Sequence, residues 1–393
     1  MHGVCFMSRK AGLVWGLLGQ GRASQTMNRS YAAIPEALRS AFSFCVQQVR
    51  QYDYLNYVWV AQMPKELRPP LFALRAFNIE TALVVDSVRS KELVVGQIRF
   101  QWWRDAIKSA YDGRPPNHPV ALALAHVLHS PGPATATGAS GNAHADDVNP
   151  DSGEIRCRSD GCNLSSCDSV GGDPASRAAD VFPGHCDRGI SASPPPYSRY
   201  CFKRIIDCRE ADFLDPQPPL DLQALEKYAE GTSSQLMYLQ LAAAGIKHRD
   251  ADHAASHLGR ATGITTLLRG TAAHAASRRC YLPVDLCAEA RVSQEDVYNG
   301  VVSEGLRDVV HKVASLAKGH LDEARRLAPR LPLGAAGVML PAVAVGRYLQ
   351  ALESVNFNPY DPTLIRKQGG SGAGSAPVSY ILEVKWHHLR GTY

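Results

Sequence analysis

Apolar residues recur at steps of three and four along most of this chain, the spacing that places them on one face of an α-helix. One such run is Leu222, Leu225 and Tyr228, and another is the segment 309–316. The strict alternation of apolar and polar residues that predicts a β-strand is scarce. Prolines separate the runs at intervals that suit helices joined by turns. The pattern predicts an all-α fold, a large helical bundle.

Two stretches interrupt the helical pattern. Residues 131–200 are rich in Gly, Ser, Ala, Pro and Asp and contain few large apolar side chains, so we expect a disordered insertion there. The sequence QGGSGAGSA at 368–376 is typical of a flexible connection, so we expect 366–393 to be a flexible linker and a C-terminal tail. The remaining parts, 41–130 and 201–365, together have the size of one large domain.

Residues 1–40 differ in charge from the rest of the chain. No Asp or Glu precedes Glu36, whereas four Arg and Lys residues and several Ser are present. This composition is typical of a mitochondrial transit peptide. A secretory signal is the rival interpretation, but it needs a longer apolar stretch than the one here, which glycines interrupt. We therefore predict a transit peptide with a flexible lead, and a mature protein in the mitochondrial matrix.

The overall composition excludes two broad classes of function. The 393 residues are 45% hydrophobic and 20% charged, with a formal net charge of +5. That surplus of positive charge is too small for a nucleic-acid-binding face, which needs clustered cations. No apolar run reaches the ~18–20 residues of a membrane-spanning helix. We predict neither a nucleic-acid partner nor a transmembrane protein.

General catalytic and metal signatures are scarce. The chain has no G-x-S-x-G elbow, no P-loop and no H-E-x-x-H motif. His253 and His257 could share a helix face, as zinc ligands do, but the sequence identifies no third ligand, and a half-buried histidine pair is the simpler interpretation. The cysteines within 157–186 lack the spacing of a zinc site. We interpret the acidic run 207–215 as the solvated face of a helix.

Several segments together resemble the squalene/phytoene synthase family of all-helical prenyl-diphosphate synthases. They are 71–88, 96–107, 113–124, 204–216, 228–241, 263–283 and 346–362. Their order and spacing carry the resemblance, which skips the insertion. It implies a large single-domain bundle of the class I isoprenoid synthase type. Active members of that family hold Mg²⁺ ions between two aspartate-rich motifs, and these ions neutralise the leaving diphosphate.

The first family motif, of the form D-D-x-x-D, falls on Ala82, Leu83 and Asp86. Apolar side chains therefore replace two of its three carboxylates, and Glu80 is poorly placed to share a helix face with Asp86. Mg²⁺ gives up its water ligands reluctantly, so a lone carboxylate offers too little to hold it. By the resemblance, Glu80 and Asp86 remain candidates for lining a cavity or contacting an anion.

The second family motif, of the form D-x-x-x-D, falls on the segment from Gly270 through Ala273 to His274, where no carboxylate remains. By the resemblance, Arg269 and Tyr281 beside it are candidates for contacting an anion or lining the cavity. The groups that would stabilise transition-state charge, usually the largest catalytic contribution, are thus absent. We therefore assign no catalytic residue, and we expect no metal and no cofactor.

The resemblance is strongest to the branch of the family that combines eroded motifs with a mitochondrial presequence and acts in assembly of respiratory complex I, the NADH:ubiquinone oxidoreductase. It implies a non-catalytic matrix protein, peripheral to the inner membrane, with complex I subunits or assembly intermediates as partners. An apolar cavity could still hold a lipid or an isoprenoid.

Two alternatives stay open. One is an active prenyltransferase that condenses two isoprenyl diphosphates with Mg²⁺, using other acids such as Asp207, Asp212 or Asp215. The other is a chaperone-like surface formed by the insertion 131–200.

Overall fold

Every regular element of the described chain is a helix. The computed structural model describes residues 35–87, 93–130, 197–367 and 377–393. The helices are α2 (Glu36–Tyr52), α3 (Tyr54–Gln62), α4 (Arg68–Ala82), α5 (Val84–Ser87), α6 (Leu93–Tyr111), α7 (Pro119–His129), α8 (Arg199–Leu214), α9 (Leu222–Ala229), η1 (Glu230–Ser234), α10 (Gln235–Ala243), α11 (Arg249–Arg269), α12 (Thr271–Ala276), α13 (Val284–Glu289), α14 (Gln294–Tyr298), α15 (Glu304–Arg326), η2 (Ala328–Arg330), α16 (Ala335–Val338), α17 (Pro341–Ser354), α18 (Pro362–Lys367) and α19 (Val378–Arg390). The predicted all-α bundle is confirmed. Within these residues, no helix is both long enough and apolar enough to cross a membrane.

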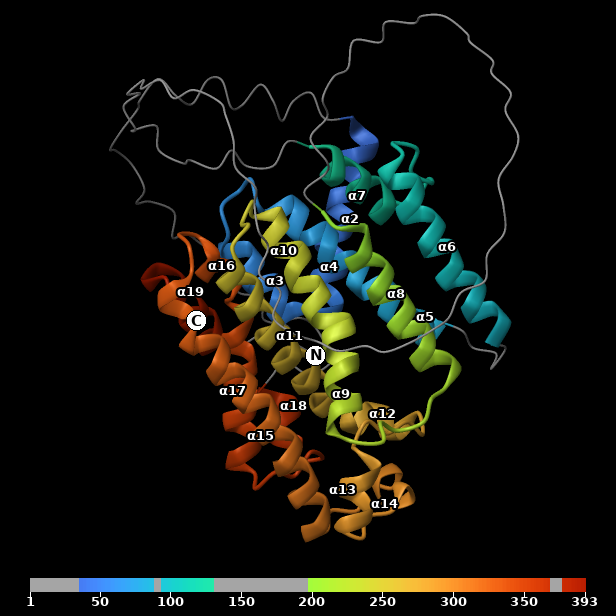
Figure 1. Ribbon diagram of the computed structural model, residues 1–393, viewed down its shortest axis with the longest axis vertical. Helices are drawn as coiled ribbons and strands as arrows, with labels where there is room; N and C mark the ends of the chain where they lie inside the picture. Colours follow the sequence, from blue (N-terminus) through green and yellow to red (C-terminus); the bar gives the residue numbers. More distant parts are fainter. Residues whose placement is uncertain (1–34, 88–92, 131–196, 368–376) are drawn as a thin grey trace, which may run out of the picture. The chain divides into compact units, whose positions relative to one another are not determined.

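Helix α11 is a central packing element of the bundle (Figure 1). Its most extensive contact is with α15, and it also contacts α9, η1, α10 and α17. Its buried positions are mostly small, including Ala254, Ala255 and Ala261. Small side chains let neighbouring backbones approach closely, so one helix can serve several partners.

A π-helical turn, η1, brings the chain against α11 at two glycines. A Cβ atom at Gly259 would lie 2.3 Å from the Ser234 Cα, and one at Gly263 would lie 2.6 Å from the Ala229 Cβ. The Ser234 hydroxyl donates to the Ser256 carbonyl across the same contact, at 2.9 Å. Single π turns occur often at functional sites, and η1 lies beside the cavity described below.

Helix α4 is buried along most of its surface. Leu71, Leu74 and Phe77 are fully buried, and the Phe77 ring meets those of Trp103 and Phe202 edge-on. Each buried side chain of this size contributes about 1.5–3 kcal/mol relative to an exposed one. Helices α2 and α7 cover one side of α4, while α8 and α10 lie against it elsewhere. The end of α4, which begins the first motif segment, is therefore held by a rigid core.

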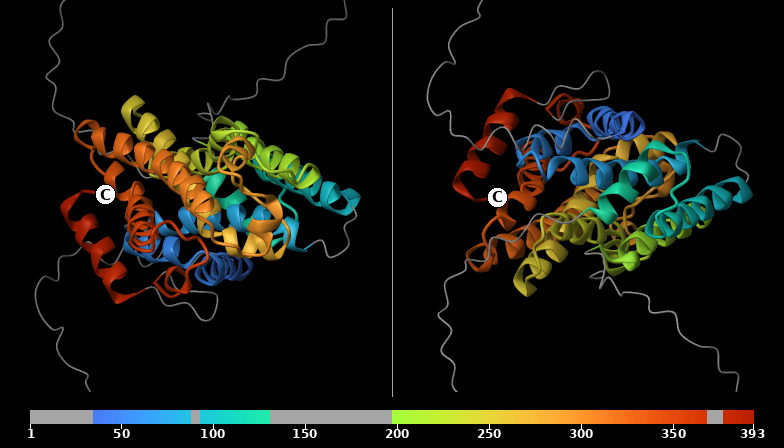
Figure 2. Two further views of the ribbon diagram at one scale, coloured as in Figure 1. Left: turned by 90° about the horizontal axis from the view of Figure 1, so that it is seen from below. Right: turned by 90° about the horizontal axis from the view of Figure 1, so that it is seen from above.

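The described helices extend beyond the domain boundaries expected from the sequence. Helix α2 begins at Glu36 and α8 at Arg199, both slightly before the predicted starts at 41 and 201. The C-terminal tail contains helix α19, which packs against α3 and α17 at the edge of the bundle in Figure 2. Tyr380 and Val384 anchor it, and the Tyr380 hydroxyl donates to the Leu55 carbonyl. The sequence predicted a linker and a tail without a defined structure for the tail. The tail forms a helix that docks on the bundle, because Tyr380 and Val384, one turn apart, are buried in the core.

The predicted transit peptide and most of the predicted insertion lie outside the described residues, at 1–34 and 131–196. The four cysteines of the insertion lie there too.

The contact between α11 and η1 predicts opposite effects for two glycine substitutions. We expect Gly259→Ala to lower the free energy of unfolding by about 1–3 kcal/mol, because its methyl group would collide with the backbone of Ser234. The control is Gly319→Ala on α15, where nothing lies within 4 Å of the added carbon. This control should stabilise the protein by about 0.5–1 kcal/mol through helix propensity alone. Chemical denaturation followed by circular dichroism measures both, and equal effects of the two changes would contradict the close contact.

Candidate functional site

A cavity of about 780 Å³ opens between α4, α8, η1, α11 and α12. Both degenerate motif segments reach it. Ala82 and Leu83 at the end of α4 line it on one side, and Ala273 and His274 in α12 line it on another. The structure therefore brings together two segments that lie almost 200 residues apart in the sequence. They meet where the resemblance placed the diphosphate end of a synthase site.

The two other candidates near the first motif are Glu80 and Asp86. Asp86 belongs to the short helix α5, and its side chain is outside the described part of the structure. Glu80 is not among the residues that line the cavity. Burial raises the pKa of Glu80, and burial together with the Glu80 carboxylate raises the pKa of the Cys45 thiol to about 12. The Glu80 carboxylate thus influences Cys45 on α2.

At the second motif, an imidazole occupies the space of the missing carboxylate. Gly270 ends α11 and His274 lies one turn later, with the His274 N–H donating to the Gly270 carbonyl at 2.8 Å. A Cβ atom at position 270 would lie 2.5 Å from the His274 Cε1. A side chain at 270 and the present His274 ring therefore exclude each other. The glycine at position 270 thus leaves the room that the His274 ring needs.

His274 is held in the cavity wall by ring contacts. Its ring meets the Tyr281 ring edge-on, with the centroids 4.7 Å apart. Its Nδ1 atom is buried and finds no hydrogen-bond partner among the described residues. Burial, assisted by the positive charge of Arg279, lowers the pKa of His274 to about 4. The imidazole is therefore neutral at physiological pH.

Among the residues that the structure describes, the cavity lining carries more positive than negative charge. Its described arginines are Arg75, Arg209, Arg269 and Arg279, and its described aspartates are Asp53 and Asp212. Arg75 and Arg209 were not found by sequence reasoning, because α4 and α8 each carry several arginines and nothing local shows which of them is buried.

Arg209 joins the two helices that form one wall of the cavity. Its guanidinium donates to the Asn78 carbonyl at 2.5 Å, to the Asn78 Oδ1 at 2.7 Å and to the Thr81 hydroxyl. Burial lowers the pKa of Arg209, but an arginine keeps its charge in proteins. Its hydrogen-bond acceptors here are neutral, so they do not cancel that charge.

Asp212 is the one member of the acidic run that reaches the cavity. Its side chain is 13% exposed, its carboxylate pairs with Arg279 at 2.9 Å, and it accepts a hydrogen bond from the Tyr281 hydroxyl at 2.9 Å. The interpretation of the run as a solvated face is therefore wrong for Asp212. Burial raises the pKa of Asp212, although Arg279 and Tyr281 oppose that effect.

The other acids of the run face away from the cavity. Asp207 and Glu210 both bind Arg104 on α6, and Asp215 is exposed at the end of α8. They do not line the cavity, so they supply no ligands there for Mg²⁺.

The described donor groups of the cavity do not fit the Mg²⁺ ions of a class I synthase. Such ions need several free carboxylate oxygens on facing helices. Asp53 and Asp212, the aspartates among the described lining residues, already pair with Arg75 and Arg279. Guanidinium groups bind phosphate oxygens directly and in a fixed geometry. The described part of the cavity is therefore better suited to binding an anion directly than to holding divalent cations.

The expected apolar cavity describes only one wall. Leu236, Met237 and Leu267 form an apolar surface, whereas the arginines, the aspartates and several neutral polar side chains line other parts of the cavity. The sequence did not predict these separate apolar and charged surfaces, because packing decides which face of each helix turns toward the cavity.

The sequence profile of the squalene/phytoene synthase family matches residues 49–156 and 169–369. The chain is 34% identical to "NADH dehydrogenase (ubiquinone) complex I, assembly factor 6" of Bos taurus over 324 residues, which cover 82% of this chain and 77% of the relative. It is 32% identical to the protein of the same name from Homo sapiens, with the same coverage.

A solved structure of a dehydrosqualene synthase in complex with ligand is similar in fold. The TM-score is 0.61 at 14% sequence identity, covering 90% of this chain and 98% of the other. The two family segments, the helical architecture and the position of the degenerate motifs agree, and the chain belongs to the squalene/phytoene synthase family.

Proposed function

We propose that this protein acts in the assembly of mitochondrial respiratory complex I as a non-catalytic member of its family. The observation that carries the proposal is the cavity itself, where Ala82 and Leu83 on one side and Gly270 and His274 on the other stand in place of carboxylates. The similarity to relatives named complex I assembly factor 6, over four fifths of the chain, supports the same function. The acid-free first 35 residues favour a mitochondrial location.

The chemistry of the cavity argues against the alternative, a working prenyltransferase. Ionisation of an allylic diphosphate needs divalent cations to neutralise the leaving group. His274 is neutral and has taken the space next to Gly270, so the second motif offers neither a carboxylate nor room for one. A protein partner, by contrast, needs a stable helical scaffold and no metal cluster.

The two walls of the cavity suit an amphipathic ligand. Arg209 and Arg279 could contact an anionic head group, while Leu236 and Met237 could contact a hydrocarbon tail. A lipid or an isoprenoid with a phosphate group has this chemistry. Binding such a molecule without catalysing its reaction would suit a protein that acts in assembly at the inner membrane.

Helix α19 supports a peripheral contact with that membrane. Leu382, Trp386 and Leu389 are 61%, 54% and 73% exposed and lie on the side opposite the buried Tyr380 and Val384. The Arg390 guanidinium lies 4.2 Å from the centre of the Trp386 ring. An exposed apolar stripe that carries a tryptophan and flanking basic groups is typical of a helix lying in the membrane interface. We therefore propose that the matrix face of the inner membrane binds α19.

The proposed function predicts complementation without catalysis. The chain, expressed in human cells that lack complex I assembly factor 6, should restore assembled complex I on native gels. The purified protein, incubated with farnesyl or geranylgeranyl diphosphate and Mg²⁺, should release no pyrophosphate above background, because its motif positions carry no pair of carboxylates. A squalene synthase assayed in parallel is the positive control. Turnover by this chain would establish the prenyltransferase alternative, and failure to restore complex I would refute the assembly role.

The neutral state of His274 predicts a specific pH dependence of stability. Its folded-state pKa of about 4 lies below the value of ~6.5 in an unfolded chain. The unfolded state therefore binds the proton first, and stability is lost as the pH falls from about 6.5 toward 4. Between pH 7 and pH 4 the wild type should lose roughly 2–3 kcal/mol more than His274→Gln, at about 1.4 kcal/mol per pKa unit. Urea denaturation at each pH measures this, and parallel profiles would show that His274 is not the group responsible.

The α19 surface predicts binding to vesicles. The full chain should bind vesicles of cardiolipin and phosphatidylcholine, and Leu382→Ser/Trp386→Ser should reduce the bound fraction about tenfold, because each lost apolar group removes roughly 1 kcal/mol or more of transfer free energy. The matched control is Leu333→Ser, another fully exposed leucine away from α19. Equal binding by the double variant and the wild type would exclude α19 as the contact.

A further inference from the structure

A cluster of histidines and glutamates lies where α9, α11 and α15 meet, separate from the lining of the cavity. His253 and His257 lie one turn apart on α11, and His320 and Glu323 occupy one face of α15. Glu226 on α9 completes the group. The sequence predicted that His253 and His257 share a helix face, but it could not assign the partners, because they lie on two other helices, α9 and α15.

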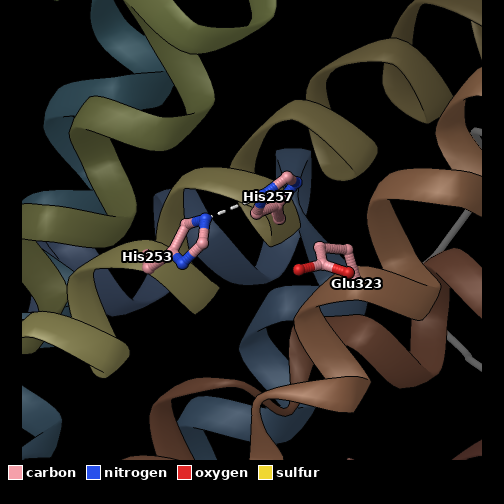
Figure 3. Close-up of side chains that lie close together, drawn as sticks. All are labelled: His253, His257 and Glu323. Atoms are coloured by element: carbon pink, nitrogen blue, oxygen red, sulfur yellow. Dashed lines mark hydrogen bonds between the residues drawn. The ribbon is translucent and has the colours of Figure 1, made fainter.

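Three of these residues present ligand atoms to one point. The ligand atoms of His253, His257 and Glu323 all lie within 4.8 Å of one another. The two Nε2 atoms of the histidines are 3.1 Å apart. Two nitrogens bound to one tetrahedral zinc ion, each at 2.0–2.1 Å, lie about 3.3 Å apart. Figure 3 shows the two imidazoles on α11 with the carboxylate beside them on α15. Small side-chain movements would bring the three groups to bonding distance of one ion.

A hydrogen-bonded chain behind His257 orients its ring. The Nδ1 of His257 lies 2.9 Å from the Nδ1 of His320, and the Nε2 of His320 lies 2.5 Å from the Glu226 carboxylate. A carboxylate accepts only, so His320 donates from Nε2, its Nδ1 accepts, and His257 donates from Nδ1. The lone pair of His257 then lies on Nε2, directed toward His253. Metal-binding histidines usually donate their second ring N–H in this way, through a partner that fixes the tautomer.

We propose that His253, His257 and Glu323 form a binding site for a divalent transition-metal ion of the zinc type, with His320 and Glu226 as positioning residues. Two imidazoles and one carboxylate form a ligand set that zinc uses in proteins, with water in the fourth position. His253 is exposed, so the ion has access from solvent, and its ring can place its proton on Nδ1 when Nε2 binds the metal. The ion would link α11 to α15, the two helices with the most extensive contact in the bundle.

Arg326 competes with the ion for Glu323. It donates to the Glu323 carboxylate at 2.8 Å from Nε and at 2.5 Å from Nη2, and its own side chain is 61% exposed. Exposed ion pairs of this kind contribute little, so a metal ion can replace the arginine. Removing the guanidinium should then strengthen metal binding, whereas removing a ligand should weaken it. These opposite effects separate a metal site from a merely structural cluster.

The test measures Zn²⁺ binding to the purified, metal-stripped full chain. Competition with a chromophoric chelator gives the affinity, and Co²⁺ in place of Zn²⁺ gives a visible spectrum that reports the ligand types. The four cysteines Cys157, Cys162, Cys167 and Cys186 are replaced by serine in every sample, because thiolates also bind zinc. Circular dichroism verifies that each variant is folded. His253 is exposed and Glu323 is half-buried, so their substitution leaves the core intact.

We expect one Zn²⁺ per chain, bound in the micromolar range or tighter. His253→Gln and Glu323→Gln should each weaken binding at least about tenfold, His320→Gln should weaken it about 10–100-fold through the orienting chain, and Arg326→Gln should tighten it. The matched control Asp322→Asn, whose carboxylate binds Lys318 on the exposed side of the same helix, should change nothing. Unchanged affinity in folded His253→Gln/Glu323→Gln would overturn the proposal, as would the absence of micromolar binding by the unaltered cluster.

Discussion

The close approach of α11 to the π turn η1 is the constraint on which the rest of the structure depends. Gly259 and Gly263 present no side chain, so the backbones of the two elements meet where a single methyl group would not fit. This contact sets how far α11 lies from α9 and how it is rotated about its axis. Its C-terminal half then faces the cavity with Thr262, Thr266 and Arg269. Its N-terminal half presents His253 and His257 toward α15. One packing contact thus positions two polar sites at opposite ends of one helix.

The electrostatics of the cavity depend on the residue types at the two motif segments and on the arginines that line it. Carboxylates at the two motifs would leave a synthase cavity strongly negative until metal ions arrive. Here Ala82, Leu83 and His274 carry no charge, while Arg209 keeps a buried positive charge whose hydrogen-bond acceptors on α4 are neutral. Asp212 is neutralised by Arg279 instead of being free for a cation. The balance therefore favours an anion that brings its own charge, and it disfavours divalent cations. At the second motif, the His274 ring fills the space that a side chain at position 270 would need, so a carboxylate at position 270 would not fit beside the present ring.

The C-terminal helix illustrates how a weak pattern becomes a defined structure. Val378–Arg390 is too short to be a stable helix alone. Tyr380 and Val384 bury their side chains against α3 and α17, and the terminal Tyr393 donates its hydroxyl to the Ala324 carbonyl. Docking on that side leaves the opposite apolar stripe of the helix exposed. The same helix therefore packs on the edge of the bundle with one face and carries the surface that we propose binds the membrane on the other.

The sequence by itself determined the helical class, the family and the residue types at the two motif segments. Each of these depends on residue type and local spacing, so the spacing of Leu222, Leu225 and Tyr228 or the identity of Ala82 and Gly270 suffices. Only the tertiary structure decided which charged residues are buried. Asp207 and Asp212 look alike in the sequence, yet one binds Arg104 near the surface and the other binds Arg279 in the cavity. They lie about 140° apart around α8, and only packing decides which of the two faces turns toward the cavity. The partners of His253 and His257 were hidden for the same reason, since Glu323 and His320 become neighbours only when α11 and α15 pack together.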